Sequence, residues 1–366
     1  MAMDFDNHSE YYEYPHLKFR KLCTGKRMEI DELLLLPLLV EAHGLVGVLN
    51  GMSRCIGNIN RYTEVFMMKE VCASCRMADT QITFFELMRL CDNNEDAACL
   101  QMRLLDAMKY AWEQSANFDI KRIHSILVGG KPNKSEFRND KVSSINDFNL
   151  NLYTPIMAGY VEKAMADIDI FMSGEYEEDT IIKAALLQYQ LEIVSPFEMH
   201  SRILARMIPM VVLKRNNLLT HPVLWISDFM ADFKVAYEDR IEVSYKLDDT
   251  RVWIMYFLKV LNGSARKTIH QIEHLEESRQ KHINIIASLG TNHRTIHMIY
   301  NFVANAIFVN VRQISSALEI SYNTVAKAIN IFNELGIIRQ VNQGERYRTF
   351  GYCPILDLFS DGEITA

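Results

Sequence analysis

Proline, glycine and long apolar runs are all scarce in this sequence. The 366 residues include 8 prolines and 15 glycines, which argues against a disordered or loop-rich chain. The longest apolar run near the start, LLLLPLL, covers residues 33–39, whereas a transmembrane helix needs about twenty apolar residues. We therefore expect a folded protein without a membrane partner.

An excess of positive charge is also lacking, because the formal net charge is −7. The chain as a whole has no general attraction for nucleic acid, so contact with DNA would need a local basic patch. Residues 1–16, MAMDFDNHSEYYEYPH, are acidic and aromatic and do not have the pattern of a secretory signal. The seven cysteines are then expected to be free thiols in a reduced, cytoplasmic protein.

Four cysteines have a spacing that raises the question of a zinc site. Cys72 and Cys75 form a C-x-x-C pair, and Cys91 and Cys99 follow it. The second pair is more widely spaced, however, and no histidine lies between the pairs, which departs from structural zinc sites. We favour small apolar thiols on packed helices and expect no metal site.

Apolar residues make up 49% of the chain, and most recur with the helical period of three or four positions. One segment, from Asp179 to Ser195, predicts an amphipathic helix capped by Asp179 or Thr180. Its expected buried face consists of Ile182, Ala185, Leu186, Tyr189 and Ile193. The chain length and the changes between helical and hairpin-like sequence patterns predict three domains, at residues 1–120, 121–290 and 291–366.

Residues 293–358 have the pattern of a winged helix-turn-helix. A helix over residues 293–308 and a second over 312–320 precede a third, which begins after Ser321 and ends at Gly336. Two short β segments around a turn at residues 342–345 then form a hairpin. The expected helical core consists of Ile314, Ala317, Leu318, Ile320, Val325, Ile329, Phe332 and Leu335.

On this interpretation, the third helix points polar side chains toward base edges and phosphates. Residues 311–350 contain five Lys or Arg and three Glu, a net charge of +2 (5 − 3), which is a weak electrostatic footprint. A module that mediates protein contacts or dimerisation is the alternative. The expected DNA-binding residues are Tyr322, Asn323, Thr324 and Lys327 on the helix, and Arg339, Arg346 and Arg348 in the wing.

A central motif, SPFEMHSRILAR, runs from Ser195 to Arg206 between two helical stretches. It resembles the motif of the Fic (filamentation-induced-by-cAMP) family, whose generic form is HPFxxGNGRxxR. Members of that family usually transfer AMP from ATP to a hydroxyl side chain of a target protein. Residues 69–81, KEVCASCRMADTQ, resemble the family's inhibitory helix, and residues 129–145 resemble its target-aligning flap, with a typical element at Glu136, Phe137 and Arg138.

The resemblance predicts a mainly α fold, in which a Fic-like helical bundle with a β-hairpin flap is followed by the winged helix-turn-helix. It also exposes departures from the family motif. Ser195 stands where the family has its general base, a histidine, and a serine hydroxyl has no useful basicity near pH 7. His200, Ser201 and Arg202 stand where the family has a Gly-Asn-Gly turn, and their side chains would crowd bound phosphates.

Some positions of the motif are retained or can be realigned. Glu198 matches an acidic residue that often helps to hold a metal ion in the family, and Arg206 matches the second arginine. If one residue is deleted after Glu198, Arg202 takes the first arginine position and Arg206 loses its match; both alignments stay open. The resemblance thus gives Ser195, His200, Arg202 and Arg206 as the catalytic positions, and Glu198, Ser201 and Arg206 as the nucleotide-binding positions.

The inhibitory helix departs from the family as well. Its motif is close to [ST]xxxE[GN], and the glutamate reaches the phosphate-binding arginine. Here Ser74 is followed four residues later by Ala78 and then by Asp79. The inhibitory carboxylate is therefore missing, unless Asp79 substitutes for it from one position further along.

Two hypotheses for the function follow from the motif. The first is a catalytically degenerate Fic-like protein that acts as a DNA-binding regulator or a partner-binding module, with no cofactor. The second is an active nucleotidyltransferase that uses His200, Arg202 or Arg206 to transfer AMP from ATP, with magnesium, to a protein target. The expected partners are DNA, a target protein and a second copy of the chain, since many helix-turn-helix proteins read two half-sites.

Overall fold

The computed structural model is mainly helical, as the sequence predicts, and its contacts divide the chain into two compact units. Unit 1 comprises residues 1–53 and 66–265, and unit 2 comprises residues 54–65 and 266–366. The described parts of the chain are residues 11–14, 17–20, 32–56, 59–80, 82–84, 86–87, 99–130, 135–139, 155–174, 178–289, 293–306, 308–342 and 348–358.

This division differs from the three ranges expected from the sequence. The expected boundary near residue 290 follows the end of a helix, whereas the contact pattern changes inside that helix, after Ala265. The reason is that α11 (Thr250–Ala287) is continuous for 38 residues, so one helix supplies contacts to both units.

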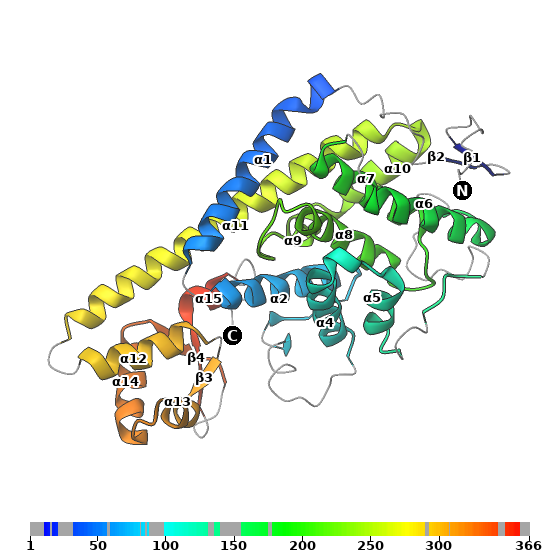
Figure 1. Ribbon diagram of the computed structural model, residues 1–366. Coiled ribbons are helices and arrows are strands. Elements are labelled where there is room, and N and C mark those ends of the chain that lie inside the picture. Colours follow the sequence, from blue (N-terminus) through cyan, green and yellow to red (C-terminus); the bar gives the residue numbers. More distant parts are fainter. Residues whose placement is uncertain are drawn as a thin grey trace. The chain divides into compact units, whose positions relative to one another are not determined.

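Unit 1 is a helical bundle preceded by one small antiparallel sheet (Figure 1). In the sheet, Tyr12 pairs with Phe19. The elements are β1 (Tyr11–Tyr14), β2 (Leu17–Arg20), all but the last two residues of α1 (Glu32–Cys55), the part of α2 (Ile59–Met77) from Phe66 on, α4 (Leu100–Glu113), η1 (Ser115–Asn117), α5 (Ile120–Leu127), η3 (Ala158–Tyr160), α6 (Val161–Ser173), α7 (Thr180–Val194), α8 (Ser201–Arg215), α9 (Ser227–Asp232), α10 (Lys234–Leu247) and the first part of α11.

Helix α7 is buried on every side, so the expectation of a single buried face was wrong. Its polar residues Gln188, Gln190 and Glu192 are at most 2% exposed. The cause is the position of α7 between α6 and α8, with Trp253 of α11 donating a hydrogen bond to its backbone at Ala185. The predicted cap is confirmed, because the Asp179 side chain accepts hydrogen bonds from the first N–H groups of the helix.

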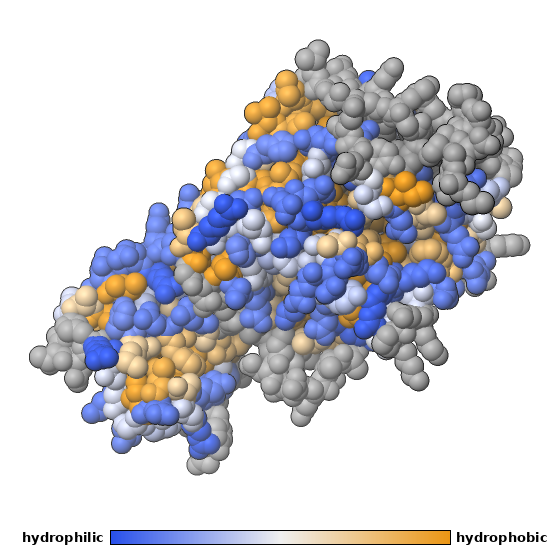
Figure 2. Space-filling model, viewed as in Figure 1, coloured by the Kyte–Doolittle hydropathy of each residue, from blue (hydrophilic) through white to orange (hydrophobic). Residues whose placement is uncertain are grey.

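Helix α1 has enough length and apolar composition over Leu34–Cys55 to span a membrane, although core helices of folded proteins meet the same test. Asn50 binds the backbone N–H of Thr220 at 2.9 Å, so one side of α1 is attached to the bundle. Another side exposes apolar groups (Figure 2). The expected absence of a membrane partner stays a prediction. The exposed apolar side chains on α1 are Leu34, Leu36, Val40 and Val48.

Unit 2 combines short helices with a three-stranded antiparallel sheet of order β3-β5-β4. The predicted hairpin is present as β4 paired with β5, in which Ile338 lies opposite Tyr352. The first helix ends earlier than expected, because Phe308 begins a strand that pairs with β5. The elements are α12 (His293–Ala304), β3 (Phe308–Asn310), α13 (Val311–Leu318), α14 (Tyr322–Glu334), β4 (Ile338–Gln340), β5 (Thr349–Tyr352) and α15 (Cys353–Asp357).

The predicted start and end of the third helix of this unit, α14, are confirmed. The Ser321 hydroxyl accepts the N–H of Thr324 at 3.3 Å, and Gly336 takes a left-handed conformation with φ of +68° directly after the helix. Part of the expected core was wrong, however. Ala317 and Leu335 are exposed, because they lie on the sides of their helices that face away from the packed core. The expected core residues that are fully buried are Ile314, Val325, Ile329 and Phe332.

Candidate functional site

The central motif forms the turn between α7 and α8, the most extensively packed pair of helices in unit 1. Ser195 ends α7 and His200 precedes α8, and both take the left-handed conformation, with φ of +42° and +62°. Two non-glycine residues in that region show that the turn is held by its surroundings, since each costs about 1 kcal/mol or more. Ser195 is fully buried, and its hydroxyl has no hydrogen-bond partner among the described residues.

The described part of the expected flap, residues 135–139, lies on this turn. It is irregular rather than a strand. Gly129 and Gly130 lie at the turn after α5, and residues 131–134 and 140–145 of the expected hairpin fall outside the described part of the chain. The backbone N–H of Arg138 donates to the carbonyl of Pro196 at 2.9 Å. Its guanidinium donates to the carbonyls of Ser195 at 2.7 Å, Val194 at 3.1 Å and Ile156. Arg138 is 3% exposed, and its guanidinium is bound to backbone carbonyls within the bundle.

A histidine that the sequence analysis overlooked lies beneath the same turn. The His124 ring stacks on Phe197, with 3.8 Å between the centroids, and its nitrogens bind the Ser135 hydroxyl at 2.8 Å and the Met199 carbonyl at 3.1 Å. Burial lowers the pKa of His124 to about 4, so the ring is neutral at pH 7. Because both nitrogens are engaged, the ring positions the turn and is poorly suited to accept a proton.

On α8, Arg206 points toward α2. Its guanidinium is 3% exposed and lies 3.5 Å from the carbonyl of Ser74. The positive charge of Arg206 also acts on Glu70, a buried carboxylate one helical turn before Ser74. Burial raises the pKa of Glu70 to about 7, and the Ser227 hydrogen bonds and Arg206 oppose that rise. A buried carboxylate of α2 therefore faces the motif arginine.

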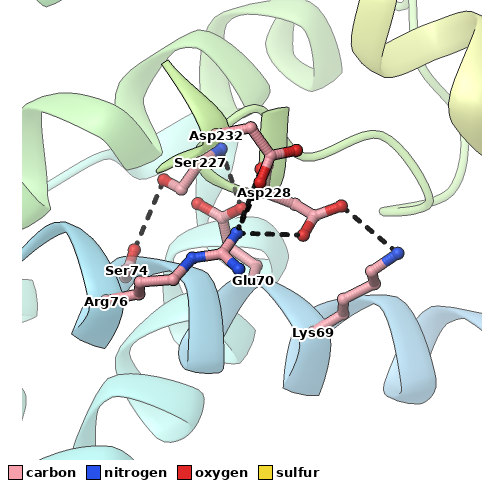
Figure 3. A network of polar contacts seen from close by, with 7 residues as sticks. All are labelled: Lys69, Glu70, Ser74, Arg76, Ser227, Asp228 and Asp232. Atoms are coloured by element: carbon pink, nitrogen blue, oxygen red, sulfur yellow. Dashed lines mark hydrogen bonds and ion pairs between the residues drawn. The ribbon is translucent and has the colours of Figure 1, made fainter. Parts of the chain in front are cut away.

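A polar network holds α2 against α9, and Figure 3 shows it. Glu70 accepts the backbone N–H of Ser227 at 3.0 Å, and the Ser74 hydroxyl donates to that of Ser227 at 3.4 Å. On either side, Lys69 lies 3.2 Å from Asp228, and Arg76 lies 3.2 Å from Asp232. The network fixes α2 against α9 through both buried and exposed side chains.

Arg202, one helical turn before Arg206 on the same face of α8, belongs to a second cluster. Its Nε lies 3.2 Å from a carboxylate oxygen of Glu192, which is buried in α7, and its guanidinium lies 3.8 Å from Glu238. The hydroxyl of Tyr237 donates to the same Glu192 carboxylate. This cluster joins α7, α8 and α10, so Arg202 is engaged in an ion pair, whichever alignment of the motif applies.

Comparison with known structures was decisive for the fold. No family model matches the chain. A Fic family protein from Desulfovibrio desulfuricans G20 aligns over 87% of this chain and 95% of its own, with a TM-score of 0.54 and 13% sequence identity. The chain has the Fic fold.

Two further structures agree with this assignment. A Fic domain-containing signalling protein from Bacteroides thetaiotaomicron VPI-5482 aligns over 65% of this chain and 97% of its own, with a TM-score of 0.50 and 13% identity. Fic-1 from C. elegans aligns over 66% of this chain and 74% of its own, with a TM-score of 0.50 and 16% identity. The Fic fold expected from the motif is confirmed, although the sequences have diverged widely.

Several groups at the motif positions are already engaged by the protein itself. Ser201, at a position of the phosphate-binding turn, donates its hydroxyl to the Phe197 carbonyl at 3.0 Å and receives the Phe197 N–H at 2.9 Å. The guanidiniums of Arg138 and Arg206 lie against backbone carbonyls. Glu198 is exposed, and the described residues contain no cluster of His, Cys, Asp or Glu able to hold a metal ion.

The three positions expected to form the inhibitory motif, Ser74, Ala78 and Asp79, do not lie together at one site. Ser74 lies beside Arg206, whereas Ala78 and Asp79 are exposed beyond the end of α2. Asp79 pairs with Lys234 at 2.6 Å, so it does not replace the inhibitory glutamate. Glu70, one turn before Ser74, is instead the α2 carboxylate on which the charge of Arg206 acts. A glutamate in the apolar stretch FMMKEVCA was the available signal, because a buried charge usually has a specific partner.

The side chains expected to contact DNA are spread along the surface of unit 2. Tyr322, Asn323, Thr324 and Lys327 are exposed along the first half of α14. In the wing, Arg339 lies 3.6 Å from Asp357 and Arg348 lies over the Phe350 ring, whereas Arg346 falls outside the described residues. The other expected flap residues, Glu136 and Phe137, lie next to Lys121.

Proposed function

We propose that this chain is a Fic-fold protein that transfers no nucleotide and acts as a DNA-binding regulator through unit 2. The observation that carries the first part is Ser195, a fully buried serine at the position of the family's catalytic base. A general base must come within hydrogen-bond reach of the proton that it removes. The Ser195 hydroxyl is not basic near pH 7, and because it is buried it cannot reach the proton of a target hydroxyl.

The binding half of the site supports the same conclusion. Phosphate groups are usually held by free backbone N–H groups and by arginine side chains. Here Arg138 donates three guanidinium hydrogen bonds to backbone carbonyls, and Arg206 is buried against α2. These groups stabilise the closed bundle and are not available to a nucleotide.

Incubation of the full chain with radiolabelled ATP, GTP, CTP or UTP and magnesium is expected to leave no label on any protein in a cell extract. Calorimetry with ATP and magnesium is expected to show no binding heat, because the guanidiniums of Arg138 and Arg206 are buried against backbone carbonyls. The same reaction with the His200→Ala variant tests the alternative, an active transferase that uses His200 as its base. A label that disappears in this variant would show a transferase with a substitute base and would overturn the first part of the proposal.

The second part rests on unit 2. We interpret α13 and α14, followed by the β4–β5 hairpin, as a winged helix-turn-helix. A capping box at Asn310 and Gln313 starts α13, and the Ser321 cap starts α14. The exposed side chains of Tyr322, Asn323 and Lys327 lie in the first half of α14, the part of a recognition helix that contacts base edges. We further propose a cytoplasmic location.

Lys327→Ala is expected to weaken binding of the full chain to duplex DNA about fivefold to tenfold at low salt. It should also reduce the slope of log K against log salt by about one, because one phosphate contact is lost. Fluorescence anisotropy over a range of salt concentrations measures both quantities. Lys259→Ala, which removes an exposed lysine from the unit 1 part of α11, is the matched control and should change neither.

Failure of the full chain to bind any DNA at low salt would overturn the regulator assignment. An equal loss in both lysine variants would point to general charge attraction, and would also contradict a role for α14. A stable complex with protein alone would instead favour the partner-binding module.

A further inference from the structure

The outward face of α1 is apolar over residues 34–51. Every exposed residue in this stretch is aliphatic, proline or glycine, and Val40 alone is 61% exposed. Figure 2 shows part of this apolar surface. A continuous apolar face of this kind on a folded protein usually marks a site of contact with another molecule.

The polar side chains of the same stretch are Glu41, His43 and Asn50, and all of them bind the bundle. Glu41 accepts the side-chain amide of Asn262 in α11 at 3.0 Å. The His43 ring lies 2.7 Å from the Asp179 carboxylate, and Asn50 binds the loop after α8. The polar groups of α1 therefore attach it to unit 1, and its outward face keeps only apolar groups.

Three glycines, Gly44, Gly47 and Gly51, lie along this outward face. A Cβ added at any of them would meet no atom of the described chain within 4 Å, so the packing of unit 1 does not require glycine there. Glycine also destabilises a helix interior relative to alanine. Because glycine lets another backbone approach closely, these positions form a shallow groove suited to a helix of another molecule.

We propose that α1 is the interface of a homodimer, in which the α1 helices of two copies pack antiparallel around a two-fold axis near Gly44. One register places Leu36 opposite Gly51 and Val40 opposite Gly47. Each large side chain of one copy then lies in the glycine groove of the other, and the two-fold symmetry repeats both contacts. The face is thus complementary to itself, which favours a second copy over an unrelated protein.

The charges at the two ends of α1 favour the antiparallel arrangement. The helix begins at Glu32 and has Arg54 in its last turn. An antiparallel pair brings opposite charges together at both ends, whereas a parallel pair would bring like charges together. The helix dipoles also attract each other when they are antiparallel.

A membrane surface fits this face less well than a second copy. Helices that lie on membranes usually combine several Lys or Arg residues with Trp, Phe or Leu. Helix α1 has neither Trp nor Phe, and Arg54 is its only Lys or Arg. The three glycines would also weaken insertion into lipid, because they add no apolar side chain.

The size of the face predicts a weak dimer. Helix α1 has 24 residues, so it is about 36 Å long and about 10 Å wide. Each copy would contribute a strip of roughly 360 Å², at the small end of specific interfaces, and we expect a dimer Kd on the order of 10 µM. If unit 2 binds DNA as proposed, the dimer would carry two copies of it, but the interface does not rest on that proposal or on the Fic motif.

Sedimentation velocity of the full chain at about 1 to 200 µM, without DNA, tests the interface. Gly47→Leu is expected to weaken self-association at least about tenfold, because the new side chain would occupy the space of Val40 from the other copy. It should leave the monomer folded, since leucine is the better helix former and meets no described atom there. Gly159→Leu adds the same side chain at another exposed position with the same free space, and should change nothing.

The orientation is tested by oxidative cross-linking with copper phenanthroline, measured against wild type. Gly44→Cys lies beside the two-fold axis and should form a disulfide-linked dimer. Val48→Cys should not, because in the antiparallel register the two copies of this position are more than about 10 Å apart along the helix axis. Equal cross-linking of the two variants would contradict the antiparallel register.

Three other outcomes would overturn the proposed interface. The first is a wild-type chain that stays monomeric at every concentration, and the second is self-association that Gly47→Leu leaves unchanged or strengthens. The third is flotation of the wild type with phosphatidylcholine–phosphatidylglycerol vesicles that increases in Gly47→Leu. That change adds apolar surface, so it would strengthen a membrane contact while it weakens the dimer.

Discussion

Replacing Arg138 with methionine is expected to lower the free energy of unfolding of unit 1 by about 3 to 5 kcal/mol. The guanidinium is buried and donates to the carbonyls of Ser195, Val194 and Ile156. Methionine fills part of the space but leaves these acceptors unsatisfied, and each buried unsatisfied acceptor costs about 1 to 3 kcal/mol. Arg138 also holds a turn in which Ser195 and His200 both have positive φ angles, a conformation that needs support from the surrounding structure.

Urea unfolding followed by tryptophan fluorescence measures this loss selectively. The chain has three tryptophans, Trp112, Trp225 and Trp253, and all lie in unit 1. Glu136→Gln is the matched control in the same segment. It removes an exposed ion pair with Lys121, which is expected to contribute less than about 1 kcal/mol. Similar effects of the two variants would show that Arg138 does not hold the turn.

The second large effect concerns pH. The free energy of unfolding of unit 1, compared with that of Glu70→Gln, is expected to fall by about 3 kcal/mol as the pH rises from 4.5 to 7. Burial raises the pKa of Glu70 from 4.5 to about 7, a shift of about 2.5 (7 − 4.5), and each pKa unit corresponds to about 1.4 kcal/mol. Between the two values the folded state binds more protons, so stability decreases with pH.

The same fluorescence measurement, repeated from pH 4.5 to 7 on both proteins, checks this expectation. The difference between wild type and Glu70→Gln isolates Glu70 from the other titrating groups. Arg206 and Asp228 face the carboxylate from α8 and α9 and act in opposite directions. A difference that does not change with pH would mean that Arg206 keeps Glu70 ionised throughout the range.

Local sequence signals predicted the helices and several of their ends. The cap at Asp179 and the cap at Ser321 are formed by side chains that bind backbone N–H groups two or three residues away, so a short window of sequence contains the whole interaction. The Fic fold was also accessible, because Pro196, Phe197, Glu198 and Arg206 retain their places in a short motif.

Interactions between distant segments could not be predicted in this way. Helix α7 has an amphipathic pattern, yet α6, α8 and α11 bury its polar side as well. The contact of Arg138 with Ser195 joins positions 57 residues apart, and the approach of Glu70 to Arg206 joins α2 to α8. His124 was overlooked for the same reason, since its partners Ser135 and Met199 become neighbours only in the folded chain.

The division of α2 and α11 between the units has a consequence for biosynthesis. Residues 54–65 belong to unit 2, but the 200 residues from 66 to 265 are translated before the rest of that unit begins. At about 5 to 20 residues per second, this interval lasts about 10 to 40 s. During that time Tyr62 and Val65 lack the partners that the later part of unit 2 supplies, such as Glu276 for the Tyr62 hydroxyl. Unit 2 can therefore complete its core only after the residues that follow Ala265 have been translated.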